Sequence, residues 1–158
     1  IGGVVLGCDT SAAENIKDKV DFFVYIGTGK FHPLGVALKT GKKVLVANPL
    51  TNQVSEISKE EVESYKKKLK GKYLKFLNAK KVGILVSTKA GQYRLKKAFE
   101  LQEKLEKPSY IFMANNFSEN ELENYTDVGI FINTACPRIE FDNVVNIADI
   151  DEMVEIFA

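Results

Sequence analysis

The sequence predicts an α/β protein made of two consecutive parallel-sheet units, with ligand loops at the carboxyl edge of the strands. Three observations support this prediction. Six short apolar runs alternate with helical segments, and two of those segments begin with a capping-box sequence. A long amphipathic segment centred near residue 67 separates the first three runs from the last three.

The six apolar runs are rich in β-branched and aromatic residues, as strands are. Their residues are nearly continuous rather than alternating in polarity, so we expect strands covered on both faces. The predicted strands are residues 3–6, 22–26, 44–47, 82–86, 110–113 and 128–132.

Two predicted helices start at Ser58 and Ser118, each followed three residues later by a glutamate, Glu61 or Glu121. In the first helix, apolar residues recur every three or four positions and mark a core-facing stripe: Val62, Tyr65, Leu69, Tyr73 and Phe76. The surrounding lysines (Lys66, Lys67, Lys68, Lys70, Lys72 and Lys75) are interpreted as a solvated face, with docking of an acidic partner as the alternative. The resulting domain boundaries are 1–55, a connecting helix 56–78, and 79–158.

Composition restricts the class of protein. The chain has 158 residues, of which 45% are hydrophobic and 27% charged, which excludes a disordered or fibrous chain. Lys and Arg number 22 and Asp and Glu 21, so bulk charge gives no argument for nucleic acid or a membrane surface. No apolar run approaches the roughly 20 residues of a membrane span, and no signal peptide is recognisable, so we expect a cytoplasmic protein.

Four loops that follow predicted strands contain small and polar residues: 7–11, 27–35, 87–92 and 133–138. Parallel strands direct such loops to one sheet edge, where α/β proteins bind ligands. The glycines of the second loop fit neither a P-loop nor a dinucleotide fingerprint. His32, the single histidine, is either structural or an acid–base group, whereas Lys89 and Arg138 could bind a carboxylate or phosphate or form surface ion pairs.

The two cysteines, Cys8 and Cys136, form no disulfide framework and no CxxC motif. Each alone could be a small buried hydrophobic residue. Both nevertheless fall in loops at strand ends, which raises the alternative of a ligand role. Two thiolates do not suffice for an iron–sulfur cluster, so a third would have to come from elsewhere.

Residues 6–13, 27–35, 86–92 and 133–139, taken in this order, closely resemble the 2-(3-amino-3-carboxypropyl)histidine synthase family of diphthamide biosynthesis, in its archaeal form. The resemblance implies three α/β domains, each giving one cysteine to a [4Fe–4S] cluster. It implies cleavage of S-adenosylmethionine to a 3-amino-3-carboxypropyl radical, which is transferred to a histidine of translation elongation factor 2. It also implies a homodimeric full-length enzyme.

By this resemblance Cys8 and Cys136 are cluster ligands. Residues proposed for the S-adenosylmethionine pocket are Gly27, Thr28, Gly29, His32, Ser87, Lys89, Gly91, Gln92 and Arg138, and no catalytic residue is assigned. Residues 1–55 then correspond to part of the family's second domain and 79–158 to its third. We expect a fragment without the N-terminal domain, inactive by itself because the third cysteine has no counterpart.

Two alternatives remain open at this point. Quinolinate synthase also has three α/β domains and a three-cysteine [4Fe–4S] cluster, but its open iron acts as a Lewis acid on a carboxylate substrate. The other alternative is a non-catalytic subunit that binds a nucleotide or a protein partner. Both matched cysteines favour the first interpretation over the last.

Overall fold

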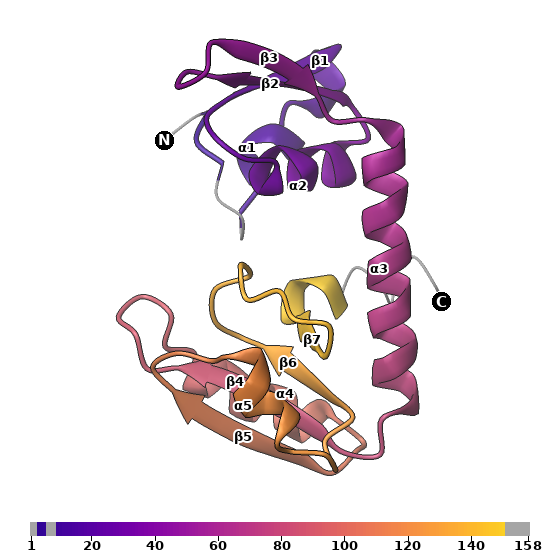
Figure 1. Ribbon diagram of the computed structural model, residues 1–158, viewed down its shortest axis with the longest axis vertical. Helices are drawn as coiled ribbons and strands as arrows, with labels where there is room; N and C mark the ends of the chain where they lie inside the picture. Colours follow the sequence, from indigo (N-terminus) through magenta and orange to yellow (C-terminus); the bar gives the residue numbers. More distant parts are fainter. Residues whose placement is uncertain (1–2, 6–8, 151–158) are drawn as a thin grey trace. The chain divides into compact units, whose positions relative to one another are not determined.

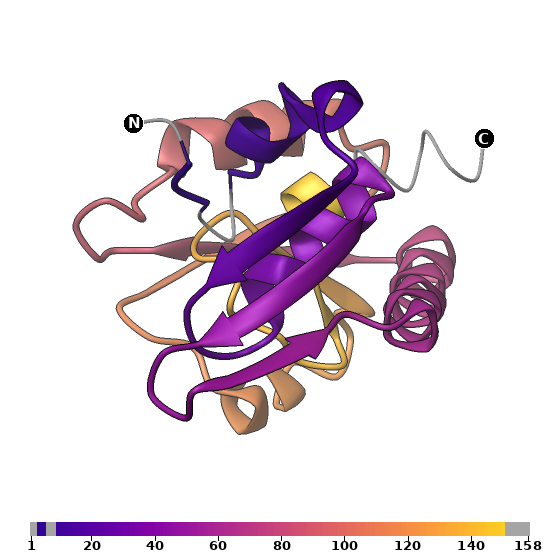
Figure 2. The same ribbon diagram turned by 90° about the horizontal axis from the view of Figure 1, so that it is seen from above.

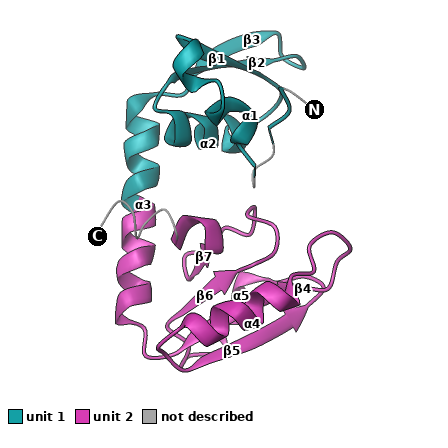
Figure 3. Cartoon of the chain, turned by 180° about the vertical axis from the view of Figure 1, so that it is seen from behind, with its two compact units in different colours: residues 1–67 teal, residues 68–158 magenta. Residues whose placement is uncertain are grey.

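The computed structural model describes residues 3–5 and 9–150, and the chain forms two compact units that divide between residues 67 and 68 (Figure 3). Unit 1 contains α1 (Ser11–Glu14), the 3-10 helix η1 (Lys17–Lys19), β1 (Phe22–Ile26), α2 (Phe31–Thr40), β2 (Lys43–Asn48), β3 (Gln53–Glu56) and the start of α3 (Lys59–Asn78). Unit 2 contains the rest of α3, then β4 (Val82–Ser87), α4 (Leu95–Lys104), β5 (Ser109–Ala114), α5 (Glu119–Glu123), β6 (Ile130–Asn133) and β7 (Val144–Asn146).

Unit 1 has a three-stranded sheet in the order β1-β2-β3 (Figure 2). β1 and β2 are parallel, as predicted, whereas β3 runs antiparallel to β2. Helices α1 and α2 lie on the same side of this sheet (Figure 1). Their residues Ala13, Val36 and Ala37 pack with Val44 and Val46 of β2 in one buried cluster.

The other face of this sheet is exposed in the described residues. β1 alternates between exposed and half-buried residues, so that Phe22, Val24 and Ile26 face water while Phe23 and Tyr25 pack on the core. The expectation of two covered faces is therefore wrong for β1. An apolar run can alternate in exposure without alternating in polarity, and its composition alone does not distinguish the two arrangements.

Unit 2 has a four-stranded, fully parallel sheet in the order β5-β4-β6-β7. Every residue of β4 and β6 is buried, which confirms the expectation of coverage on both faces for these two strands. Ala98 of α4 packs with Ile84 and Val86 on one face. Leu122 of α5 packs with Leu85 and Phe131 in a second cluster.

Both predicted capping boxes are present. At the start of α3 the Glu61 N–H donates to Ser58 Oγ at 3.2 Å, and Ser58 N–H donates to Glu61 Oε2 at 3.0 Å. At the start of α5 the Ser118 N–H donates to Glu121 Oε2 at 3.1 Å. Each box satisfies backbone donors that have no partner within the helix.

The predicted stripe of α3 is confirmed, because its five members are buried or half-buried while most residues around them are exposed. Lys72 departs from the predicted solvated face, since it is half-buried. Burial lowers the pKa of Lys72, although Glu140, Asp142 and Asp149 favour its charged form. Lys75 donates to the Asp142 carbonyl at 3.2 Å, so these two lysines face acidic neighbours within unit 2.

Three further differences concern short elements. Of predicted strand 3–6, Gly3 lies in a turn, Val4 and Val5 belong to no helix or strand, and the remaining position lies outside the described residues. β3 and β7 were not predicted, because one is wholly exposed and the other has three residues. Within the described ranges, no helix has the length and apolar character required to cross a bilayer.

Candidate functional site

The loop after β1 reaches the start of α2. Gly29 has φ +75°, a left-handed conformation that favours glycine, and a Cβ on Gly27 would lie 2.8 Å from the Tyr25 hydroxyl. Helix α2 begins at Phe31, and no side chain of the described residues caps it, so these residues leave the N–H groups of Phe31 and His32 available to a ligand. Thr28 is exposed beside them. The loop is thus a turn that leads from β1 directly into α2.

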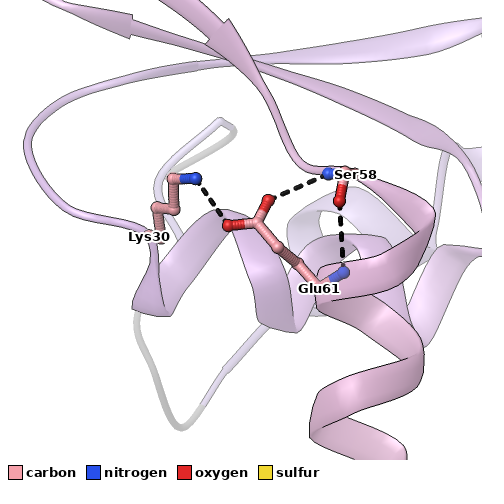
Figure 4. Close-up of polar contacts among 3 residues, drawn as sticks. All are labelled: Lys30, Ser58 and Glu61. Carbon is pink, nitrogen blue, oxygen red and sulfur yellow. Dashed lines mark hydrogen bonds and ion pairs between the residues drawn. The ribbon is translucent and has the colours of Figure 1, made fainter.

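His32 lies in the first turn of α2 and is half-buried between aromatic rings. Its ring is 5.4 Å from that of Phe31 and 6.1 Å from that of Tyr25, centroid to centroid. Its Nδ1 is buried and has no hydrogen-bond partner within the described residues. The neighbouring Lys30 pairs with Glu61 Oε1 at 2.5 Å (Figure 4).

The loop after β4 lies at the carboxyl edge of the unit 2 sheet. Ser87 is buried, accepts the Lys89 N–H at 3.2 Å and donates to the Asn115 carbonyl at 3.4 Å. The ammonium of Lys89 donates to Asn116 Oδ1. Hydrogen bonds thus connect the loop after β4 to the loop after β5, and the exposed Lys89 supplies a cation at this edge.

The remainder of this loop is a tight turn. Gln92 N–H donates to the Lys89 carbonyl at 3.0 Å, and Gly91 has φ +77°. Gly91 is exposed and Gln92 is half-buried. The turn keeps Lys89, Gly91 and Gln92 at the carboxyl end of β4.

The loop after β6 begins with a contact to the neighbouring strand. Thr134 is buried, and both its N–H and its hydroxyl donate to the Leu85 carbonyl of β4, at 3.1 and 2.8 Å. Cys136 follows two residues later, half-buried and with a free thiol, and Arg138 is exposed. Because β4 and β6 are adjacent and parallel, Cys136 and Arg138 lie at the same sheet edge as Ser87 and Lys89.

The buried side chains of Asn133 and Asn146 hydrogen-bond to the loop of residues 134–143, called here the cysteine loop. Asn133 Nδ2 donates to the Cys136 carbonyl and to Asn146 Oδ1, each at 2.8 Å, and Asn133 Oδ1 accepts the Ala135 N–H at 2.9 Å. Asn146 Nδ2 donates to the Pro137 carbonyl at 3.2 Å. Sequence reasoning missed Asn146, although a polar residue ending a buried apolar run was a usable signal.

The predicted site residues thus fall into two groups that the structure places separately. Gly27, Thr28, Gly29 and His32 belong to unit 1, and Ser87, Lys89, Gly91, Gln92, Cys136 and Arg138 to unit 2. Cys8 lies outside the described residues. Sequence reasoning also missed Asn116, which follows the predicted strand 110–113 and partners Lys89.

The described part of the chain contains no group of three His, Cys, Asp or Glu side chains able to hold a metal ion. It supplies one accessible thiol, at Cys136, and a thiolate is the usual protein ligand of an iron–sulfur cluster. This donor fits one ligand position of a cluster. It does not form a complete site.

A family model described as "Putative diphthamide synthesis protein" matches residues 2–146. The chain belongs to this family. That match includes both cysteines and every predicted pocket residue, and it confirms the resemblance stated on the four motifs.

Two curated relatives are named 2-(3-amino-3-carboxypropyl)histidine synthase. The protein from Methanocaldococcus jannaschii is 35% identical over 147 residues, covering 90% of this chain and 41% of that relative. The protein from Pyrococcus horikoshii is 35% identical over 144 residues, covering 89% and 40%. The chain therefore spans about two fifths of the length of these family members.

A solved structure shares the fold. The crystal structure of Dph2 from Pyrococcus horikoshii with a 4Fe-4S cluster matches with a TM-score of 0.77 and 33% sequence identity, covering 98% of this chain and 45% of that one. This similarity confirms the α/β class that the sequence predicted.

Proposed function

We propose that this chain forms part of a [4Fe–4S] enzyme that cleaves S-adenosylmethionine and transfers its 3-amino-3-carboxypropyl group to a histidine of translation elongation factor 2. This is the first step of diphthamide biosynthesis. Family membership, the names of the relatives and the 4Fe-4S cluster of the Dph2 structure support the proposal. The observation that carries it is the free, half-buried thiol of Cys136 at the carboxyl edge of a parallel sheet.

Cys8 and Cys136 would hold the cluster, with a third cysteine from a part of the enzyme without counterpart here. Residues 1–55 would belong to the family's second domain and 79–158 to its third. When bound, the cluster would supply the single electron that breaks the Cγ–S bond of S-adenosylmethionine.

The chain's own residues would bind and orient the substrate. Lys89 and Arg138 carry exposed cationic groups suited to a carboxylate, and the uncapped start of α2 offers amides to an anionic or polar group. Holding the substrate in one orientation selects which of its three C–S bonds breaks. We propose the same binding role for Gly27, Thr28, Gly29, His32, Ser87, Gly91 and Gln92.

The reaction balances as a substitution. A low-potential one-electron donor provides the electron, methylthioadenosine leaves, and the radical forms a bond to an imidazole carbon. The ring then loses one proton to solvent and returns one electron to the oxidised donor as it regains aromaticity. The net products are the alkylated histidine, methylthioadenosine and a proton.

The test is anaerobic reconstitution with iron and sulfide of this chain and of a chain of the relatives' full length, followed by visible absorbance and a methylthioadenosine assay under reduction. We expect a cluster and methylthioadenosine in the full-length protein only. A cluster without methylthioadenosine would favour the Lewis-acid alternative. No cluster in either protein would contradict the proposal and favour a non-catalytic binding subunit.

A further inference from the structure

Two asparagines face each other where β6 and β7 end. The strand register pairs Asn133 with Asn146, and both are buried, Asn133 with only 1% of its surface exposed. Burying an amide away from water is unfavourable unless hydrogen bonds replace those it made with water. We therefore expect two such side chains, at paired positions of a buried sheet, to have hydrogen-bond partners.

All four side-chain N–H groups of the pair have an acceptor. Asn133 gives one to Asn146 and one to the Cys136 carbonyl, and Asn146 gives one to the Pro137 carbonyl and one to Asp149 Oδ2 at 3.2 Å. Two of the four acceptors are thus consecutive backbone carbonyls of the cysteine loop. The side-chain oxygen of Asn133, Oδ1, accepts the Ala135 N–H.

The connection between β6 and β7 explains why the loop needs side-chain partners. Residues 134–143 join two parallel strands without forming a helix or a strand. Most parallel connections include a helix, which satisfies its own backbone groups. In this connection the Cys136 carbonyl accepts the Ile139 N–H of the loop's own turn at 3.1 Å and, in addition, the buried Asn133 amide, while the Pro137 carbonyl accepts the Asn146 amide.

We propose that Asn133 and Asn146 are positioning residues for Cys136. By fixing the backbone carbonyls of Cys136 and the next residue, they hold the thiol at a constant place and exposure before any metal binds. The relevance to a cluster rests on the proposed function, whereas the effect on the thiol belongs to this chain alone. A prearranged ligand also lowers the ordering cost of binding a cluster.

The test measures the rate at which iodoacetamide alkylates Cys136 in the native chain, with Cys8→Ser making it the single thiol. In Asn133→Asp both Nδ2 donors are lost while the acceptor for Ala135 remains. Asn146→Asp removes the donor to the Pro137 carbonyl but keeps the acceptor for Asn133. Asn124→Asp, at an exposed helix end, controls for charge, and Ile84→Val in the other core cluster controls for lowered stability.

We expect alkylation to be at least about fivefold faster in Asn133→Asp, less accelerated in Asn146→Asp, and unchanged in both controls, because a released loop exposes its thiol more often. A rate within about twofold of the parent in folded Asn133→Asp would overturn the proposal. Should that variant not fold, the same criterion applies to Asn146→Asp.

A second readout uses the reconstituted protein of full length, in which the Asn133→Asp cluster should lose its visible absorbance to an iron chelator faster than the parent cluster. Alkylation requires no cluster, so the two proposals fail separately. Unchanged alkylation contradicts the positioning role, whereas absence of any cluster in the parent contradicts the proposed function alone.

Discussion

Glu61 binds Lys30 and its own helix start at the same time. Its Oε1 accepts the Lys30 ammonium at 2.5 Å, while Oε2 accepts the Ser58 N–H at 3.0 Å (Figure 4). One carboxylate therefore links the loop before α2 to the first turn of α3.

Replacing this carboxylate should destabilise unit 1. We expect Glu61→Ala to lower the free energy of unfolding by about 1 kcal/mol, since it removes both the capping box and a partly exposed ion pair. Urea unfolding followed by circular dichroism measures the change. Glu63→Ala is the matched control, because Glu63 lies in the same helix and, among the described residues, forms an ion pair with exposed Lys66. Equal effects of the two substitutions would contradict the linking role.

The same contact predicts a pH dependence. The hydrogen bond from Lys30 and that from the Ser58 N–H hold the pKa of Glu61 below its ordinary value in the folded state. This contribution to stability is complete above the unfolded pKa of about 4.3 and is lost as the pH falls through the lowered folded pKa. The difference in free energy of unfolding between the parent and Glu61→Gln should therefore shrink as the pH falls below about 5. A difference that does not change with pH would exclude the Glu61 carboxylate as its source.

Lys107 closes the carboxyl end of α3. Its ammonium donates to the carbonyls of Phe76, Leu77 and Ala79 at 2.8, 2.6 and 3.1 Å. We expect Lys107→Met to lower the free energy of unfolding by about 1–2 kcal/mol, because helix-end carbonyls lose a cationic donor. Denaturant unfolding measures it. Lys104→Met, an exposed position at the end of α4, should have little effect, and a comparable loss there would contradict the prediction.

Cys136 is predicted to be a cluster ligand. In a reconstituted chain of the relatives' full length, Cys136→Ala should abolish most bound iron and the visible absorbance, because too few thiolates remain. Iron analysis and absorbance measure the outcome. Substitution of the buried but non-ligating Thr134 by Val serves as the control for this loop. Full retention of the cluster in Cys136→Ala would contradict the assignment.

Lys89 is predicted to bind the substrate rather than the cluster. Lys89→Ala should weaken S-adenosylmethionine binding about tenfold with the cluster intact, since a charged hydrogen bond is lost. Calorimetric titration of the protein with its cluster oxidised, under anaerobic conditions and without a reductant, measures the affinity because no cleavage occurs. Lys96→Ala changes the same charge at an exposed position of α4. An unchanged affinity would leave Lys89 only its contact with Asn116.

The sequence predicted β4 of unit 2 well because its burial leaves a continuous apolar signal over six residues. β4 is buried at every position, from Val82 to Ser87, and its predicted and observed limits differ by one residue. The capping boxes were predictable for a similar reason, since Ser58 and Glu61 need only their spacing to interact.

The remaining features depend on contacts between distant residues. Nothing local distinguishes Val24, which faces water, from Tyr25, which packs on the core. The bond between Asn133 and Asn146 joins residues thirteen positions apart and depends on the register of two strands. Site loops could thus be located from the sequence, but the groups that hold them could not.

The uncovered side of the β1-β2-β3 sheet has a practical consequence for handling the chain. Ile26 is 75% exposed, Val54 on β3 is also exposed, and β1 forms an open edge of the described sheet. Open edges beside apolar surface promote association between copies as concentration rises. The Lys43–Glu56 ion pair, at 2.7 Å across β2 and β3, places charge beside this surface. Solubility should therefore set the upper concentration for this chain, and its alkylation and unfolding are best measured in dilute samples at moderate salt.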